Sequence, residues 1–236
     1  MNRLPEPASS TAPSSRTVPP KRNLAPDKPP LWKRFLDLSL LLGALPLLLP
    51  LMGLIALAIK LVSPGPVFFV QERVGYRCRL FRCYKFRTME VDADAGAHRQ
   101  HLEQLIRTNA PMKKLDRTGD PRLIPFAAVL RASGLDELPQ LINVLRGEMS
   151  LVGPRPCASY ELPHYRPSQL RRFDAVPGLT GLWQVSGKNL TTFTEMIAMD
   201  VYYAQHQSFW LDVKILTATF PAIVAQVRQQ RARSGK

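Results

Sequence analysis

The sequence is poor in cysteine, and its few cysteines are not spaced for cross-linking or metal binding. Cys78, Cys83 and Cys157 are odd in number and form no CxxC pair or other paired metal-ligand spacing. Neither a disulfide framework nor a zinc site is indicated, and a reducing cytoplasm is the simplest location. The four histidines make no recognisable metal set.

Acidic residues are also scarce relative to basic ones. The chain has 18 Asp and Glu against 32 Lys and Arg, a net charge of +14 over 236 residues. Such an excess calls for a polyanionic neighbour: nucleic acid, an anionic membrane surface or a phosphorylated substrate. The chain has no arginine-rich recognition helix and no platform of interleaved aromatic residues, so nucleic acid is not the expected partner. A basic, membrane-anchored binding or scaffold protein remains the alternative to an enzyme.

The first 30 residues lack a periodic apolar face. Residues 1–30 are rich in Pro, Ser, Ala and basic side chains, so burial cannot offset the entropy cost of ordering them. They are predicted to form a disordered cytosolic tail. No apolar run with a small-residue cleavage site begins near Met1, so a secretory signal is not expected.

One segment, residues 36–62, has membrane-grade hydrophobicity and is long enough for a full span. Pro46 and Pro50 lie inside it and predict a kink or a break. Basic residues flank both ends, which opposes translocating either end. A helix that enters and leaves on one face of the membrane satisfies both flanks, so residues 31–62 are predicted to be a re-entrant membrane helix, with a kinked full span as the alternative.

The rest of the chain predicts a mixed α/β, helix-rich domain over residues 63–228, followed by a basic tail at 229–236. Strand patterns cover Val67–Gln71 and residues 79–87, with a turn at Gly75 between them. A helical pattern surrounds residues 98–106. A helical stripe near the C-terminus fits either core packing or an interfacial membrane helix; its residues are Leu211, Ile215, Leu216, Phe220, Ile223, Val224 and Val227.

The stretch 133–156 combines a helix start, two adjacent acids and a basic turn. Ser133-Gly134 supplies a cap, and Pro139 is tolerated only in a first helical turn. The sequence therefore predicts a helix that begins near residues 135–138 and runs to about Arg146.

Asp136 and Glu137 fall at the N-terminal end of this helix, where unpaired N–H groups and the helix dipole favour negative charge. An ionised carboxylate there can be a nucleophile or a Mg²⁺ ligand, and the same helix end attracts phosphate. Adjacent helical residues point about 100° apart, so different roles are expected for the two acids. The residues alone equally allow that the two acids have no catalytic role, because acidic residues are common in the first turn of a helix.

The run Gly153-Pro154-Arg155-Pro156 predicts a rigid turn that presents one guanidinium. A planar donor fork held in this way suits bidentate phosphate recognition or stacking on a base. The same turn could instead be structural, with Arg155 capping a helix C-terminus.

Seven blocks, spread in order from about Lys33 to Val227, resemble the bacterial sugar transferases of the polyprenyl-phosphate hexose-1-phosphate transferase family, the monotopic phosphoglycosyl transferases. The blocks are KRFLDLSLLL at Lys33, SPGPVFFVQERVG at Ser63, YKFRTME at Tyr84, GDPRLIP at Gly119, LDELPQLINVLRGEMSLVGPRP at Leu135, PGLTGLWQVSGKN at Pro177 and MDVYYAQHQSFWLDVKIL at Met199.

The resemblance implies an enzyme that transfers hexose 1-phosphate from a UDP-sugar to polyprenyl phosphate and releases UMP. It implies that Asp136 is the nucleophile that forms an aspartyl phosphosugar, and that the Asp136–Glu137 dyad binds Mg²⁺, with Glu137 helping to hold the ion. Lys85 and Arg155 would neutralise or orient phosphate groups, and Asp200 would support the pocket. Glucose or galactose is the favoured hexose.

The resemblance also implies a place at the bacterial inner membrane, with the catalytic domain on its cytoplasmic face. Two departures from the family pattern are visible. The family's re-entrant helix is broken at a Ser-Pro pair, where this chain has Leu45-Pro46. The family usually carries arginine where this chain has Lys188, a predicted substrate-binding residue that keeps the charge and loses the planar fork. Asp212, another acid shared with the family, is expected to cap a helix.

Overall fold

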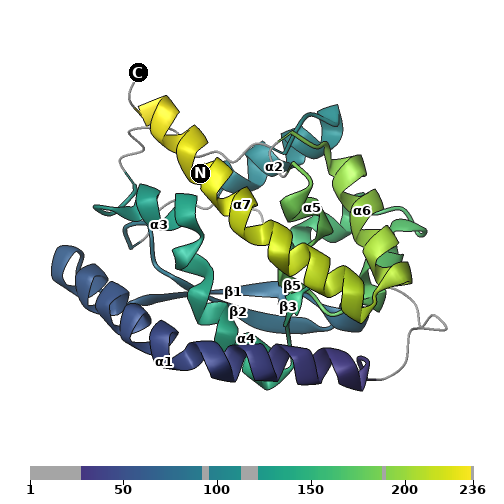
Figure 1. Ribbon diagram of the computed structural model, residues 1–236. Coiled ribbons are helices and arrows are strands. Elements are labelled where there is room, and N and C mark those ends of the chain that lie inside the picture. The colour runs from purple at the N-terminus through teal and green to yellow at the C-terminus, as the bar shows by residue number, and fades with distance from the viewer. Residues whose placement is uncertain (1–27, 92–95, 113–121, 188–189, 235–236) are drawn as a thin grey trace, which may run out of the picture.

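The computed structural model describes residues 28–91, 96–112, 122–187 and 190–234. Within them the chain is helix-rich with small sheets, which confirms the mixed α/β part of the predicted fold class. Helix α1 (Leu31–Val62) runs along one side of the sheets, and helix α7 (Phe209–Ser234) crosses on the other (Figure 1). The predicted disordered tail, residues 1–30, falls outside the described residues except for residues 28–30.

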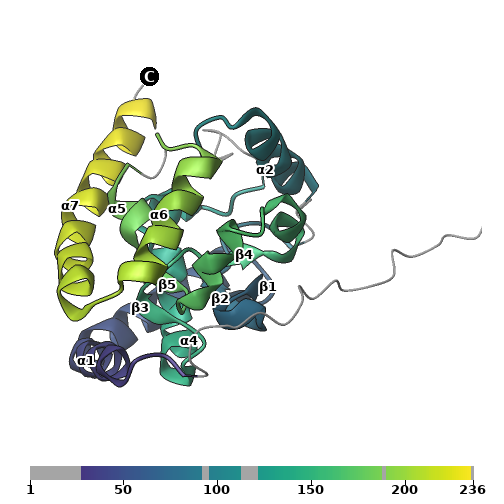
Figure 2. The same ribbon diagram turned by 90° about the vertical axis from the view of Figure 1, so that its right-hand side faces the viewer.

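In Figure 2 both helices lie at the left of the molecule, with α1 below α7, and the sheets lie beside them toward its middle. A three-stranded antiparallel sheet has the order β2-β1-β4, with β1 (Phe68–Val74), β2 (Leu80–Phe86) and β4 (Cys157–Ala158). Strands β3 (Ser150–Val152) and β5 (Gly178–Thr180) pair in parallel. The two predicted strands are therefore found as the β1–β2 hairpin, turning at Gly75 and the 3-10 helix η1 (Tyr76–Cys78).

The remaining helices surround the sheets. They are α2 (Gly96–Thr108), α3 (Ala127–Ser133), η2 (Leu135–Gln140), α4 (Leu141–Arg146), η3 (Ser159–His164), η4 (Gln169–Asp174), α5 (Leu182–Val185) and α6 (Phe193–His206). The main core joins β1, η4 and α6 through residues that include Val74, Phe173, Met196 and Ile197. The helix predicted around residues 98–106 is α2.

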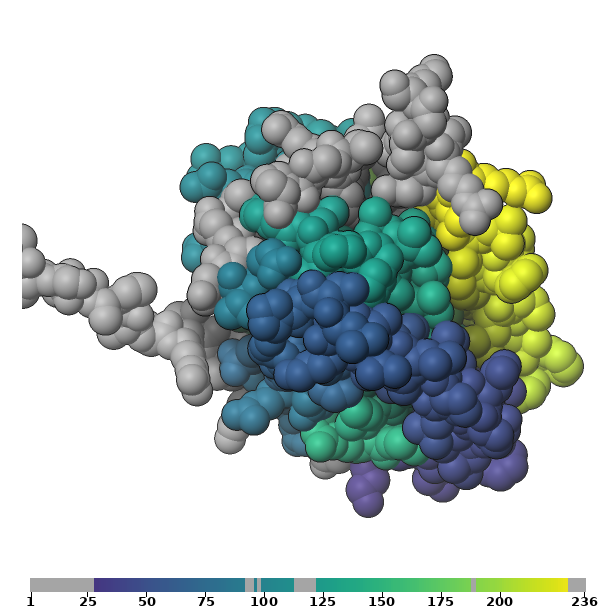
Figure 3. All heavy atoms as spheres, turned by 90° about the vertical axis from the view of Figure 1, so that its left-hand side faces the viewer, coloured from purple at the N-terminus to yellow at the C-terminus, as the bar shows by residue number. Residues whose placement is uncertain are grey.

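Helix α1 lies on the surface and buries only a narrow stripe. Leu41, Ile55 and Ile59 pack against core residues of the strands and the other helices. Many of its other apolar side chains are exposed, among them Leu31, Phe35, Leu42, Leu47, Leu54, Leu57 and Leu61. Figure 3 shows the helix lying across one face of the molecule. In Figure 1 it bends near its middle, where Pro46 and Pro50 lie, so the predicted kink is present within one continuous helix.

The N-terminal end of α1 is fastened to the domain by a buried ion pair. Lys33 Nζ lies 2.5 Å from Asp212 Oδ2 and 2.8 Å from the Tyr203 hydroxyl, and Lys33 and Asp212 are each about 1% exposed. Arg34 donates to the carbonyls of Val144 and Leu145 at the end of α4. The expectation that Asp212 caps a helix is thus wrong, because its carboxylate pairs with Lys33. Lys33 also adds no exposed charge to the basic flank.

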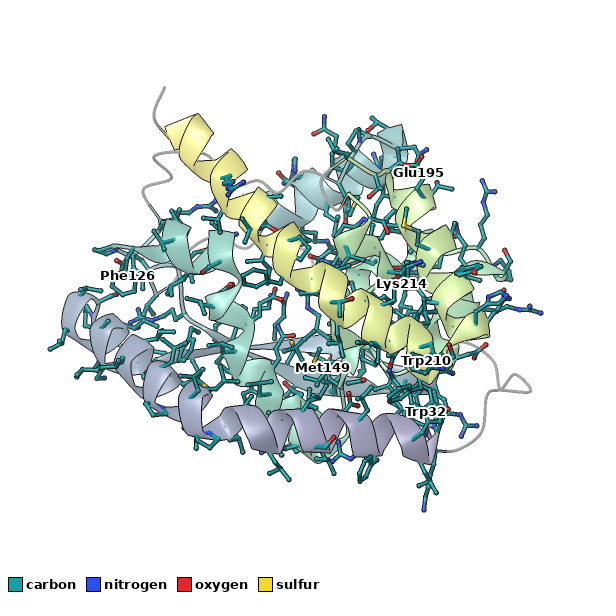
Figure 4. All side chains as sticks on the ribbon, viewed as in Figure 1. Trp32, Phe126, Met149, Glu195, Trp210 and Lys214 are labelled. Carbon is teal, nitrogen blue, oxygen red and sulfur yellow. The ribbon has the colours of Figure 1, made fainter. Side chains whose placement is uncertain are left out.

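Helix α7 is a second helix of membrane-grade hydrophobicity, whereas the sequence pattern predicted only one such segment. Leu31–Val62 and Phe209–Arg228 are both long and apolar enough to cross a membrane, by length and composition alone. The predicted stripe divides in two: Ile215 is 1% exposed in the core, whereas Phe220 is 75% exposed. Trp210 lies near Trp32 of α1 (Figure 4), and Phe209 stacks edge-on with both. Exposed apolar side chains on both helices suggest membrane association.

Candidate active site

The two adjacent acids lie where the sequence places them, but in a tighter helix. Gly134, with φ of +75°, ends α3 and starts η2, a turn that glycine adopts without strain. Asp136 and Glu137 occupy the first turn of η2, and α4 follows directly. This first part is a 3-10 helix, and Pro139, which has no N–H to donate, lies inside it. In a helix with about three residues per turn the two carboxylates diverge, which is consistent with unequal roles.

Strand β2 brings Lys85 to the dyad. Lys85 Nζ lies 2.7 Å from Glu137 Oε1, and the two side chains are 26% and 35% exposed. Asp136 is half-buried beside this pair. Lys85 and Glu137, far apart in the sequence, therefore meet at an accessible surface, and Asp136 precedes Glu137 in the same turn.

The charges of several side chains act on Cys83, a buried residue of the same strand. Cys83, also on β2, is 1% exposed, and burial raises the pKa of its thiol. The charges of Lys85, Arg73, Glu137 and Arg155 also act on the pKa of that thiol. The structure thus brings the predicted residues Lys85 and Glu137 into contact, whereas Arg155 pairs with Glu161.

The Pro-Arg-Pro turn is held from both sides. A Cβ on Gly153 would lie 2.1 Å from the carbonyl oxygen of Val176, so only glycine allows the turn to approach β5 this closely. Arg155 Nη1 donates to Glu161 Oε1 at 3.2 Å, and the Arg155 side chain is 23% exposed. The guanidinium is therefore held by the protein, while part of the Arg155 side chain remains exposed to solvent.

Glu161 is the centre of this support. Its side chain is 0% exposed and lies 3.8 Å from Arg73 Nη1, and its Oε1 accepts from the Ala158 N–H. Burial acts to raise the pKa of Glu161, but the charges of Arg155 and Arg73 outweigh it and hold the pKa below its usual range. The carboxylate thus stays ionised and fixes Arg155 in place.

Asp200 does not reach the surface of the site. Its carboxylate is 1% exposed and pairs with the fully buried Arg172 at 2.5 Å. Arg172 Nη2 also donates to the carbonyl of Arg155 at 2.7 Å, and Nη1 donates to the Tyr165 hydroxyl. Burial raises the pKa of Asp200 to about 6 although Arg172 opposes the rise. Asp200 therefore supports the Arg155 turn through Arg172. Lys188 lies outside the described residues.

The buried thiols are poor candidates for a nucleophile. Cys157 is 0% exposed, and burial raises the pKa of its thiol to about 12. Burial also raises that of Cys83, as described above. Both remain thiols near neutral pH, whereas the nucleophilic form is the thiolate. The two thiols therefore do not compete with the half-buried carboxylate of Asp136 as the candidate nucleophile.

The dyad is compatible with Mg²⁺. Among the described residues no group of three or more His, Cys, Asp and Glu is arranged to hold a metal ion by itself. Mg²⁺ in phosphate enzymes needs only one or two carboxylates, because substrate phosphates and water fill the other positions. Asp136 and Glu137 provide two carboxylates at an accessible surface, so the donor set fits an ion that arrives with a phosphorylated substrate.

Three supporting residues were missed by sequence reasoning: Arg73, Glu161 and Arg172. An arginine in a strand, a glutamate in a proline-bounded turn and one of two adjacent arginines carry no local signal of function. Only the fold places them in one buried network behind Arg155.

The chain matches the family described as bacterial sugar transferase over residues 29–226. The chain belongs to this family. This match confirms the resemblance read from the seven blocks, and with it the expectation of an enzyme of the phosphoglycosyl transferase class.

Relatives of the sugar transferase family are similar over most of this chain. The exopolysaccharide production protein ExoY of Rhizobium meliloti is 40% identical over 196 residues, which cover 81% of this chain and 84% of ExoY. The galactosyl transferase CpsE of Streptococcus agalactiae is 41% identical over 199 residues, 81% of this chain and 42% of CpsE. A UDP-glucose:undecaprenyl-phosphate glucose-1-phosphate transferase of Caulobacter vibrioides is 41% identical over 202 residues, 82% of this chain and 70% of that protein. The chain thus spans less than half of CpsE and most of the other two.

Proposed function

We propose that this sugar transferase moves hexose 1-phosphate from a UDP-sugar to undecaprenyl phosphate or a similar polyprenyl phosphate, releasing UMP, as a first membrane step of exopolysaccharide or related glycan synthesis. The observation that carries the proposal is the cluster of Asp136, Glu137 and Lys85 at an accessible surface. The relatives' names support it, since they include exopolysaccharide production and undecaprenyl-phosphate transferases for glucose and galactose.

The proposed reaction has two steps. A carboxylate oxygen of Asp136 attacks the β-phosphorus of the UDP-sugar, and the bond from that phosphorus to the bridging oxygen breaks, with its electron pair leaving on UMP. The lipid phosphate oxygen then attacks the phosphorus of the aspartyl phosphosugar and releases the carboxylate. One difficult transfer becomes two easier ones.

Neighbouring side chains reduce the charge repulsion in both steps. Lys85 is a compact cation beside the dyad, and Arg155 offers the exposed part of its side chain to a phosphate. Mg²⁺, when held by the dyad and phosphate oxygens, would supply further charge neutralisation. Asp200 and Arg172 do not touch substrate in this scheme; they hold the Arg155 turn.

The same proposal places the enzyme on the cytoplasmic face of the inner membrane, with α1 as a re-entrant helix. The exposed apolar face of α1 and the bend at its two prolines support this arrangement. Exposed Trp210 on α7 adds apolar area near the start of α1, and exposed Phe220 lies further along α7. Holding the catalyst at the leaflet raises the effective concentration of a lipid acceptor.

A donor panel tests the function. The purified protein in detergent, with Mg²⁺ and polyprenyl phosphate, is incubated with UDP-glucose, UDP-galactose and UDP-N-acetylhexosamines. UMP release beyond one equivalent per enzyme should require both the lipid acceptor and one hexose donor, and mass spectrometry should show a polyprenyl diphosphate sugar. Salt-sensitive lipid binding without UMP release from any donor would favour the basic scaffold instead.

The re-entrant topology predicts that both chain ends lie on one side of the membrane. In a variant without native cysteines, Asn2→Cys and Gly235→Cys should both react with a membrane-impermeant maleimide in inside-out vesicles. Neither should react in intact cells, because both ends then lie on the cytoplasmic side, which the impermeant reagent cannot reach. Labelling of only one of the two positions from the outside would instead indicate a full span.

A further inference from the structure

Asn143 joins the two elements that carry the proposed catalytic groups. It lies on α4, which directly continues the 3-10 helix η2 with Asp136 and Glu137. Strand β2, which carries Lys85, packs against η2 and α4. The Asn143 side chain lies between them and is 0% exposed.

Every hydrogen-bonding group of this amide is used. Asn143 Nδ2 donates to the carbonyl of Arg82 at 2.6 Å and to Glu148 Oε2 at 2.7 Å. Asn143 Oδ1 accepts from the backbone N–H of Tyr84 at 3.2 Å. Two of the three bonds therefore go to backbone groups of β2 on either side of Cys83, directly before Lys85.

These bonds take the place of a missing strand. With the order β2-β1-β4, β2 is the edge of its sheet and presents unpaired N–H and C=O groups. The Asn143 amide meets one carbonyl and one N–H on that edge, as a peptide group of a neighbouring strand would. An amide side chain suits these points because its Nδ2 donates twice while its separate Oδ1 accepts. A carboxylate has no donor, and a hydroxyl has a single O–H and a single oxygen atom for all its bonds.

The Lys85–Glu137 pair does not hold itself in place. Ion pairs as exposed as this one contribute little and pay side-chain entropy to stay in one geometry. The buried bonds of Asn143 fix the backbones on both sides of the pair instead. Glu137 then reaches Lys85 from a helix whose position on β2 is already set.

We propose that Asn143 is a positioning residue for the transferase reaction: it fixes the helix of the dyad on the strand of Lys85 and thereby sets the geometry of the Lys85–Glu137 pair. This inference rests on the proposed function, in which that pair acts on the phosphates. Asn143 itself is buried and touches no substrate.

The first test is chemical labelling, which needs no activity. In Asn143→Ser, acetylation of Lys85 by an amine-reactive ester should be several-fold faster than in the parent, because Lys85 is no longer held against Glu137. Exposed Lys214 on α7 serves as the internal reference and should label equally in both. Peptide mass spectrometry of the folded protein measures both rates.

The second test is kinetic. Asn143→Ser should lower kcat for UMP release about 10- to 100-fold with little change in KM for the donor, because misplacement of reacting groups by about 1 Å costs that much. The same substitution in a Lys85→Met background should cause little further loss, since the pair that it positions is already absent. The matched control is Asn109→Ser, because Asn109 Oδ1 likewise accepts a backbone N–H, that of Thr194, away from the site.

A volume-matched variant covers the case in which Asn143→Ser does not fold. In Asn143→Asp/Glu148→Gln the bond between the two side chains survives with donor and acceptor exchanged, Tyr84 N–H keeps an acceptor, and only the bond to Arg82 is lost. This double variant should show faster acetylation of Lys85 and a lower kcat, each to a smaller degree than Asn143→Ser.

Two results would overturn the proposal: parent-like labelling of Lys85 in a folded variant, or an equal loss of kcat with and without Lys85. Faster labelling of Lys85 in a variant whose parent releases no UMP from any donor would mean that the proposed function fails. In that case Asn143 still fixes the Lys85–Glu137 pair, but the pair has no catalytic role.

Discussion

Asp136→Asn should lower UMP release from the UDP-sugar by about 10³-fold or more, the scale expected when a covalent nucleophile is removed. Asparagine keeps the size and the half-buried place of the side chain in η2 but has no carboxylate to attack phosphorus. The loss should appear in kcat, because the phosphate contacts of Lys85 and Arg155 remain. Initial rates in detergent with saturating donor and acceptor measure it.

Trapping of the intermediate sharpens this prediction. Without lipid acceptor, label from the sugar phosphate should stay on the parent protein and be absent from Asp136→Asn. Glu103→Gln, a carboxylate-to-amide change in an exposed pair on α2, is the control and should behave as the parent. Near-parental UMP release by Asp136→Asn would show that another group is the nucleophile, and no trapped label on the parent would favour direct transfer.

Arg172→Met should destabilise the protein by about 3–5 kcal/mol, the cost of leaving a buried partner charge uncompensated. Arg172 and Asp200 are 0% and 1% exposed, so solvent does not screen the loss. In a domain of this size the Tm should fall by roughly 10 °C. The double variant Arg172→Met/Asp200→Asn should recover much of the loss, because it removes the orphaned carboxylate and keeps its shape. Thermal unfolding of the three proteins measures the difference.

The pH dependence of this pair follows from the raised pKa of Asp200, about 6 against an ordinary 3.8. The native state binds the proton more tightly than the unfolded state, so the contribution of Asp200 to stability is present below 3.8 and is lost as the pH rises through about 6. Without Arg172 this pKa rises further. The Tm gap between Arg172→Met and the double variant should therefore narrow as the pH falls from 8 to 5. A gap that is independent of pH, or a double variant no more stable than the single, would contradict this account.

Prediction from sequence worked best where the signal was local. The β1–β2 hairpin follows from the strand patterns on both sides of the Gly75 turn, and the start of the dyad helix from Ser133-Gly134 and Pro139. It failed where the outcome depended on distant partners. Lys33 looked like a flanking cation and Asp212 like a helix cap, yet they neutralise each other across α1 and α7. No local pattern distinguishes a buried, paired lysine from an exposed one, because the pairing exists only after folding.

By itself, the sequence determined the family, the dyad and the apolar segment, because motif residues and runs of hydrophobic side chains are written along the chain. The tertiary structure decided which charges meet: Lys85 with Glu137, Arg155 with Glu161, and Asp200 with Arg172 behind the turn. It also showed Asn143 bonded to the edge of β2. Charges and hydrogen bonds act over a few ångströms, so these partners are fixed only when packing of the core brings remote segments that close.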